Sequence, residues 1–185
     1  MRIISGLHKG RRLKSKSNGR IRPTSDRVRS AIFNILPPDL SEAAVLDLYA
    51  GTGALGIEAI SRGALSAVFV DVGREAVASI RANLKEMSLE ERTRIVNQRA
   101  LAALRLLAGE GRTFDLVFAD PPYQSDEAGR VLKLIAATPL LSPEAVVVIE
   151  HDPAVRLELA YGPLTRTDYR EYGGTAVSFY ERRPK

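Results

Sequence analysis

Short apolar segments alternate with amphipathic segments from residue 44 to residue 150, and this alternation constrains the fold more than any other feature of the sequence. The expected strands span residues 45–49, 67–71, 93–97, 114–119 and 145–150. Helices are expected between them, at residues 54–62, 75–87, 101–107 and 128–137. Strands joined through helices form right-handed βαβ units, whose parallel sheet is covered on both faces. The sequence therefore predicts an α/β, Rossmann-like fold.

The end of the chain departs from this rhythm. Apolar and polar residues alternate within residues 164–172 and 175–182, on either side of Gly173-Gly174. Such a pattern around a glycine pair is typical of an antiparallel hairpin. We therefore expect a mostly parallel sheet of seven strands that the C-terminal hairpin closes at one edge.

The beginning of the chain predicts a second small unit. Apolar residues interleaved with charges indicate a hairpin that turns near Lys9-Gly10, and a helix is expected to follow with Thr24 or Ser25 as its N-cap. A length of 185 residues fits one domain. We expect this domain to comprise an extension at residues 1–40 and a core at residues 41–185.

Charge is concentrated in the extension. Residues 1–30 contain ten Lys or Arg and one acid, which gives +9, whereas the whole chain has a net charge of +5 and the other 155 residues therefore sum to −4. Lys and Arg displace counterions from phosphates, so a basic arm on an acidic body indicates a nucleic-acid partner. A solvated tail is the alternative, but the interleaved apolar residues favour a folded arm. The arm cations expected to contact nucleic acid are Lys9, Arg11, Arg12 and Lys14.

Several classes of protein are disfavoured. The chain has no cysteine, which excludes disulfides and thiolate metal sites, and its two histidines, His8 and His151, lack the spacing of a metal site. We expect no bound metal. The longest apolar run, residues 145–149, is too short to span a membrane, and the N-terminus lacks the layout of a signal peptide. The sequence therefore predicts a cytoplasmic protein.

A glycine-rich loop follows the first expected strand of the core. Gly51, Gly53 and Gly56 match the G-x-G-x-x-G spacing of dinucleotide sites, so an NAD-dependent oxidoreductase is one interpretation. Asp47 precedes these glycines, where a carboxylate would repel a pyrophosphate but suit the cationic ammonium of S-adenosylmethionine. Asp71 ends the next strand, where it can accept hydrogen bonds from ribose hydroxyls in either class. We favour S-adenosylmethionine as the cofactor.

The strongest chemical signal is the tetrapeptide Asp120-Pro121-Pro122-Tyr123, at the carboxyl end of the fourth expected strand. An amino group on a planar base is a poor nucleophile because its lone pair is delocalised into the ring. Hydrogen bonds to the Asp120 carboxylate and the Pro121 carbonyl would hold this group with its lone pair aimed at a methyl carbon. Tyr123 offers a face on which an extruded base can stack. Methylation of a ring carbon usually needs a cysteine nucleophile, so the lack of cysteine also points to nitrogen or oxygen as the acceptor.

The motifs together resemble a known family. The glycine loop and Asp120–Tyr123 are similar to those of methyltransferases that act on amino groups of nucleic-acid bases. The segments Arg2-Ile3-Ile4-Ser5-Gly6, Lys9-Gly10-Arg11-Arg12-Leu13, Arg22-Pro23-Thr24, Asp26-Arg27-Val28-Arg29 and Phe33-Asn34-Ile35-Leu36 resemble the RsmD family. This resemblance spans nearly the whole chain. It implies a Rossmann-like methyltransferase that modifies the 2-amino group of one guanine in 16S ribosomal RNA. The charge of the arm favours a large structured RNA, naked or within a small-subunit particle, over a free nucleotide as the substrate.

The resemblance also implies roles for individual residues. The expected cofactor-binding residues are Asp47, Tyr49, Gly51, Thr52, Gly53, Asp71 and Val72, with Gln98, Arg99 or the backbone near Ala100 at the adenine. The residues expected near the RNA-facing mouth are Arg22, Thr24, Arg27 and Asn34. The tetrapeptide does not distinguish guanine from adenine, so an adenine methyltransferase acting on DNA or other RNA is the alternative. An RNA-binding module without catalysis would leave the cofactor loop unexplained.

Overall fold

The computed structural model describes residues 1–15, 26–122 and 126–183. Its helices and strands follow one another along the chain in the order α1 (Asp26–Ile35), β1 (Ala44–Leu48), α2 (Ala54–Ser61), β2 (Ser66–Val70), α3 (Arg74–Glu86), the short 3-10 helix η1 (Glu90–Arg92), β3 (Thr93–Val96), α4 (Ala100–Gly109), β4 (Phe114–Ala119), α5 (Glu127–Ala136), β5 (Leu141–His151), β6 (Ala160–Tyr161), β7 (Leu164–Tyr172) and β8 (Thr175–Arg182). The N-cap predicted for α1, Thr24 or Ser25, lies outside the described residues.

The strands form one sheet in the order β3-β2-β1-β4-β5-β8-β7-β6. Strands β1 to β5 are parallel, whereas β8 pairs antiparallel with β5 and with β7. The predicted parallel sheet and C-terminal hairpin are thus confirmed. The sheet has eight strands rather than the seven expected, because the two-residue β6 pairs with β7 and is too short to show an alternating pattern.

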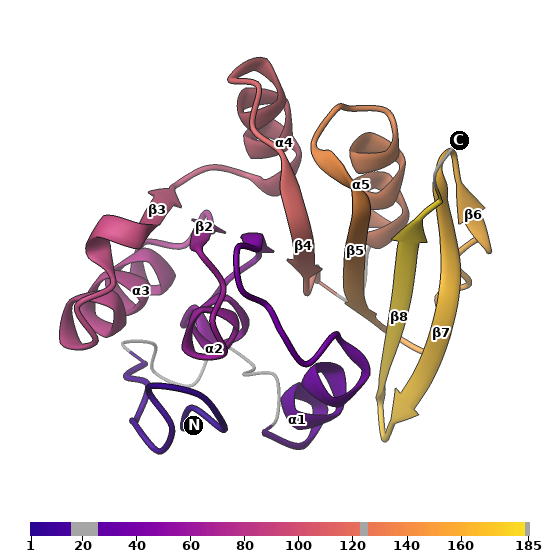
Figure 1. The fold of residues 1–185 in the computed structure, drawn as a ribbon. Coiled ribbons are helices and arrows are strands. Elements are labelled where there is room, and N and C mark those ends of the chain that lie inside the picture. Colours follow the sequence, from indigo (N-terminus) through magenta and orange to yellow (C-terminus); the bar gives the residue numbers. More distant parts are fainter. Residues whose placement is uncertain (16–25, 123–125, 184–185) are drawn as a thin grey trace.

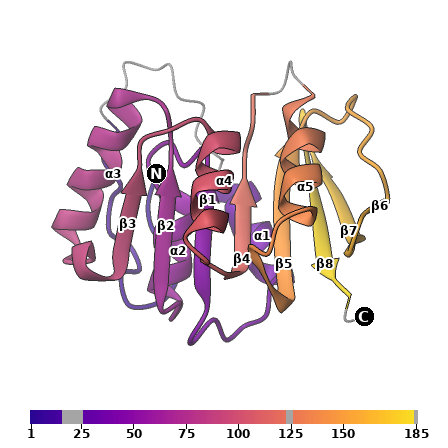
Figure 2. The same ribbon diagram turned by 90° about the horizontal axis from the view of Figure 1, so that it is seen from above.

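Helices cover both faces of the sheet (Figures 1 and 2). Helices α1, α2 and α3 pack on one face, where the core includes Phe33, Ile57 and Ile80. Helices α4 and α5 pack on the other face, where the core includes Leu104 and Leu132. Two apolar layers thus sandwich the parallel strands, as the continuous apolar runs in those strands require. In the part of the chain that the structure describes, no helix has the length and apolar character needed to cross a bilayer.

The N-terminal hairpin lies against α2 and α3 (Figure 1). Its two sides meet at one antiparallel bridge, Arg2 to Arg12, and the amide of Gly10 donates to the carbonyl of Ile3 at 2.8 Å. The predicted turn near Lys9-Gly10 is therefore confirmed. The side chain of Ile3 is buried in the same core as α1 and α2, so the hairpin is part of the fold rather than a tail.

A buried carboxylate fixes the hairpin to α2. All eight residues of α2 are buried, and Glu58 is the charged residue among them. Its carboxylate accepts hydrogen bonds from the amides of Ile4 at 2.8 Å and Ser5 at 3.0 Å, and from Arg62 Nε at 2.9 Å. The buried Arg29 guanidinium of α1 lies 3.8 Å away. One acid therefore joins the hairpin, α1 and α2.

We expect Glu58→Ala to lower the free energy of unfolding by about 3 to 5 kcal/mol, because removing one partner of a buried ion pair leaves the other uncompensated. Urea denaturation of the purified variant measures this loss. Glu110→Ala is the matched control, since Glu110 pairs with Arg94 on the surface and its loss should matter far less. Equal losses in the two variants would contradict the role given to Glu58.

Candidate active site

The site is at the carboxyl edge of the parallel strands, where open α/β sheets bind ligands. Leu48 of β1 is in register with Val70 of β2 and with Ala119 of β4. The residues that follow these partners therefore emerge side by side. Asp71 comes directly after β2 and Asp120 directly after β4, so the register brings the two predicted acids to one edge.

The glycine loop connects β1 to α2 and is tied to the sheet edge by backbone hydrogen bonds. The amide of Ala50 donates to the carbonyl of Val70 at 3.0 Å, and that of Gly53 to Ala50 at 2.7 Å. Gly53 has φ +80°, in the left-handed region that a side chain disfavours. Gly56 lies so close to the sheet that an added Cβ would be 2.5 Å from the Phe69 ring. Gly53 thus permits a tight turn, and Gly56 permits close packing of α2 on the sheet.

Asp47 is buried beneath this loop. Its Oδ2 accepts a hydrogen bond from the amide of Gly56 at 2.9 Å, in the first turn of α2. Burial raises the pKa of Asp47 to about 8, against the lowering effect of the Gly56 hydrogen bond, and the nearby charges of Asp71 and Asp120 raise it further. The register of β1 with β2 and β4 brings the three carboxylates to one edge of the sheet. Such a cluster favours a ligand that carries positive charge.

Asp71 shapes the loop with both of its carboxylate oxygens. Oδ2 accepts from the amide of Gly51 at 2.9 Å and Oδ1 from the amide of Gly73 at 2.8 Å. Asn97, which the sequence analysis did not select, donates from its side-chain amide to the backbone carbonyl of Asp71 at 2.8 Å. Val72 follows with a side chain that is 64% exposed. An acid and an exposed apolar residue thus stand together at the end of β2.

The remaining predicted cofactor residues lie at the same edge or beside it. Tyr49 follows β1 with φ +59°, and its side chain packs against the core on the α4 and α5 face. Burial is the main cause that raises its pKa. Gln98 and Arg99 are exposed between β3 and α4, and Ala100 begins α4. The first amides of a helix lack partners within it, so the Ala100 amide is suited to contact a ligand.

The Asp120 turn is described in part. Asp120 is half-buried, Pro121 is buried and Pro122 is exposed, whereas Tyr123 lies outside the described residues. Behind the turn, the rings of Phe118 and Phe33 lie 5.6 Å apart and so join β4 to α1. The Arg62 guanidinium lies over the Phe33 ring, 4.6 Å from the ring centre. The motif is therefore anchored on packed aromatic groups.

The predicted RNA-binding residues fall into two groups. Lys9, Arg11, Arg12 and Lys14 are exposed on the hairpin, and Arg27 is exposed on α1. Two of the hairpin cations also contact the end of α3, since Lys14 Nζ is 2.6 Å from Glu86 Oε2 and Arg11 donates to the Glu86 carbonyl at 3.1 Å. Arg22 and Thr24 lie outside the described residues. The hairpin thus presents exposed cations beside α3.

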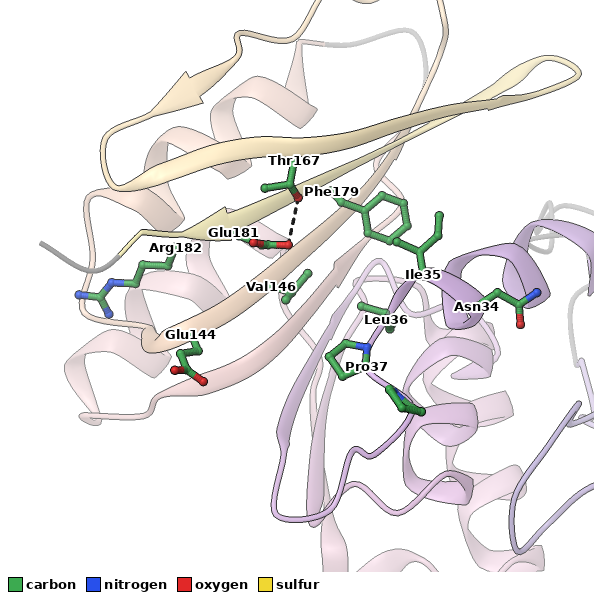
Figure 3. Close-up of a pocket in the computed structure, with 11 residues that line it drawn as sticks. Asn34, Ile35, Leu36, Pro37, Glu144, Val146, Thr167, Phe179, Glu181 and Arg182 are labelled. Carbon is green, nitrogen blue, oxygen red and sulfur yellow. Dashed lines mark hydrogen bonds between the residues drawn. The ribbon is translucent and has the colours of Figure 1, made fainter.

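Asn34 lies elsewhere, at the end of α1. It lines a cleft of about 730 Å³ between the end of α1 and strands β5 and β8 (Figure 3). The cleft includes Leu36, Val146 and Phe179, with Glu144 and Glu181 at its rim. None of its lining residues belongs to the glycine loop or to the Asp120 turn. Asn34 was expected with Arg22, Thr24 and Arg27 at the RNA-facing mouth, and the structure places it at the opposite end of α1 from Arg27.

Glu58 and Asn83 are the residues with structural consequences for the site that the sequence analysis missed. Glu58 is the one charged residue in the sequence of α2, and a lone charge in such a helix is the sequence signal that could have marked it. Asn83 has the helical spacing of the buried Ile80, Leu84 and Met87, which marks it as a polar residue on a core face. In the described ranges, no group of three His, Cys, Asp or Glu side chains is arranged to hold a metal ion.

Comparisons with known proteins agree with this geometry. The family model described as conserved hypothetical protein 95 matches residues 1–181. YlbH of Bacillus subtilis, provisionally named an rRNA methyltransferase, is 38% identical over 183 residues, which cover 99% of this chain and 100% of YlbH. Ribosomal RNA small subunit methyltransferase D of Escherichia coli K12 is 34% identical over 184 residues, which cover 98% of this chain and 90% of the relative.

A solved structure extends the comparison to three dimensions. The Escherichia coli protein yhhF, provisionally assigned as a methyltransferase, has a TM-score of 0.86 and 31% identity to this chain. The match covers 100% of this chain and 99% of that one, including the N-terminal hairpin. The predicted Rossmann-like methyltransferase fold is thereby confirmed.

Burial of Asp47 predicts a pH effect on the stability of the protein without cofactor. Its pKa is raised to about 8 in the folded state from an ordinary value of 3.8, so the stabilisation that protonation provides is complete below about pH 4 and is lost as the pH rises to about 8. Asp47→Asn keeps a carbonyl acceptor for Gly56 and does not titrate. We expect its stability advantage over the original chain to grow across this window, as measured by urea denaturation. Parallel pH profiles would contradict this prediction.

Proposed function

The chain belongs to the family of conserved hypothetical protein 95, the RsmD family, and from this premise we propose that it is an S-adenosylmethionine-dependent methyltransferase of small-subunit ribosomal RNA. The acceptor in this proposal is the 2-amino group of a guanine. The observation that carries it is the strand register, in which β1, β2 and β4 end at one edge of the sheet, so that the Asp120 turn stands beside the glycine loop.

The described residues fit S-adenosylmethionine. A cationic amino-acid head suits the neighbouring carboxylates of Asp47 and Asp71, whose mutual repulsion it relieves. The close approach of α2 at Gly56 and the left-handed turn at Gly53 leave the loop backbone open to a ligand. At the end of β2, Asp71 provides acceptors for ribose hydroxyls and Val72 provides an apolar surface for adenine. A pyrophosphate would face the same acids with repulsion, which disfavours NAD.

Catalysis in this proposal depends mainly on positioning. The cofactor supplies an electrophilic methyl group when it is bound. Asp120 accepts a hydrogen bond from the base amino group and stabilises the positive charge that develops on its nitrogen. The same carboxylate is the nearest acceptor for the proton that leaves, and the Pro121 carbonyl accepts the second N–H. The packed aromatic pair behind the turn keeps these acceptors in place.

The basic hairpin is the proposed docking surface for RNA. Its exposed cations neutralise phosphates, and its attachment through Glu58 holds them in a fixed orientation to the site. The chain then acts as one domain, with an RNA-binding extension at residues 1–40 and a catalytic core at residues 41–185. A charge of +9 on thirty residues suits a large folded RNA, such as a small-subunit particle, and the cytoplasm is the compartment in which this substrate occurs.

The acceptor is tested by transfer of labelled methyl groups to under-methylated 16S RNA, small-subunit particles, transfer RNA and DNA. We expect incorporation into small-subunit RNA at a guanine 2-amino group, identified by mass spectrometry of the nucleosides. Incorporation into adenine would overturn the proposed base. Binding of NAD in place of S-adenosylmethionine, measured by calorimetry, would overturn the proposed chemistry.

We expect Asp120→Ala to reduce the rate of methyl transfer by at least about a hundredfold while it largely spares cofactor binding, since it removes a group that acts on the base. Single-turnover assays and calorimetry measure the two effects separately. Asp152→Ala is the control, because Asp152 follows the neighbouring strand β5 at the same edge and caps a local turn through Ala154. Near-normal turnover of Asp120→Ala would refute the role assigned to this carboxylate.

We expect neutralisation of Arg11, Arg12 and Lys14 to Gln to weaken RNA binding and to flatten its salt dependence. Each lost phosphate contact lowers the slope of log affinity against log salt by about 0.7 to 0.9. Fluorescence anisotropy across a salt series gives this slope. The control neutralises three exposed cations on the α4 and α5 side, namely Arg105, Arg112 and Lys133. A slope that falls equally in both triple variants would show that total charge, and not the hairpin, determines binding.

A further inference from the structure

Asn83 of α3 connects the basic hairpin to the glycine loop. Its side chain is 1% exposed. Oδ1 accepts from the Lys14 amide at 2.7 Å, and Nδ2 donates to the Lys14 carbonyl at 3.0 Å and to the Thr52 carbonyl at 2.9 Å. Both amide hydrogens and the carbonyl oxygen of the side chain are therefore used. One side chain bonds to the basic hairpin and to the glycine loop at once.

The two residues that Asn83 contacts, Thr52 and Lys14, belong to the glycine loop and to the basic hairpin. Thr52 stands between Gly51 and Gly53, so its carbonyl is part of the turn that faces the proposed cofactor. Lys14 lies one residue before the end of the described part of the hairpin, on the side that carries Arg11 and Arg12. The other side of the hairpin also reaches the loop, since Thr52 Oγ1 lies 3.9 Å from Met1 Sδ. One side of the hairpin therefore contacts Thr52 directly, and the other side reaches it through Asn83.

Asn83 is not what holds the hairpin to the body of the protein. That attachment is provided by Glu58, which accepts from Ile4 and Ser5, and by Ser61, whose carbonyl accepts from the Leu7 amide at 2.7 Å. Ser61 Oγ also accepts from the His8 amide at 2.9 Å. These contacts lie on the far part of the hairpin and do not involve the glycine loop. The Asn83 bonds are thus separate from these attachments, because they lie at another part of the hairpin and join it to the glycine loop.

We propose that Asn83 is a positioning residue that couples the cofactor loop to the RNA-binding hairpin, so that each ligand raises the affinity for the other. A cofactor that orders the turn around Thr52 also fixes Asn83, and through it Lys14. RNA then binds a hairpin that is already more ordered, so its binding loses less conformational entropy. Because coupling of binding free energies is reciprocal, RNA raises cofactor affinity by the same factor. This inference rests on the proposed function for the identity of its two ligands.

The test is a pair of titrations on the full chain. RNA affinity is measured by fluorescence anisotropy, with a 16S RNA transcript, in the absence and presence of saturating S-adenosylhomocysteine, which cannot transfer a methyl group. Cofactor-product affinity is measured by calorimetry with and without that RNA. We expect a coupling factor of about fivefold or more, equal in both directions. In Asn83→Ala the factor falls to about one, while each ligand still binds alone.

Glu86→Gln is the matched control. Glu86 lies three residues further along the same helix and pairs with Lys14 at 2.6 Å, and its carbonyl accepts from Arg11, so that it contacts the hairpin at two places. We expect this variant to keep the coupling factor of the original chain even where its RNA affinity falls. Equal loss of coupling in both variants would overturn the inference, because it would reduce Asn83 to one of several hairpin contacts.

A measurement on the unchanged chain guards against a variant that does not fold. The Lys14 amide donates to Asn83, so its hydrogen exchange reports that bond. We expect S-adenosylhomocysteine alone to slow exchange in the hairpin peptide that contains Lys14, and unchanged exchange would overturn the inference. If neither S-adenosylhomocysteine nor RNA binds the original chain, the proposed function fails. If both bind with a coupling factor of one, the function stands and the coupling fails.

Discussion

The close packing of α2 on the sheet is the contact on which both parts of the site depend. Gly56 permits it, because any side chain there would meet the ring of Phe69. The same approach lets the Gly56 amide reach the buried carboxylate of Asp47, which fixes the first turn of α2 and hence the glycine loop. Two residues further along the helix, Glu58 faces away from the sheet and holds the hairpin. One helix thus positions the cofactor loop at its start and the RNA-binding arm along its length.

Local sequence patterns predicted the elements well because each strand and helix carries its own signal. The apolar runs located β1 to β5, and the acids that follow them could be placed at one edge because parallel strands end together. Asp71 and Asp120 were found in this way. The two-residue β6 was missed because it is shorter than one period of a strand pattern. The third acid, Asp47, was predicted to face the ligand, and its bond to Gly56 shows that it also supports the loop from below.

Contacts between distant segments explain what local patterns did not reveal. Glu58 bonds to residues 54 and 53 positions away, and Asn83 to a residue 69 positions away. No helix or strand period encodes such pairings, which depend on how the hairpin packs after the core has formed. Asn34 likewise lies at the end of α1, beside a cleft that β5 and β8 also line, whereas Arg11 and Lys14 of the hairpin contact the end of α3. Sequence patterns could propose candidate residues but could not assign them to shared surfaces.

Buried polar side chains are a costly way to fix a hairpin, and this cost bears on their purpose. Burial of charge is unfavourable unless it is compensated, and apolar residues of similar size often stabilise a protein as well or better. Glu58 and Arg29 are nevertheless fully buried where the hairpin, α1 and α2 meet. Directional bonds define the position of the hairpin backbone, which apolar contact alone leaves less specified. A protein that must present phosphate-binding groups at a fixed distance from one reacting base needs a hairpin whose position is defined in this way. The same reasoning accounts for the buried Asn83, which bonds to both the hairpin and the glycine loop.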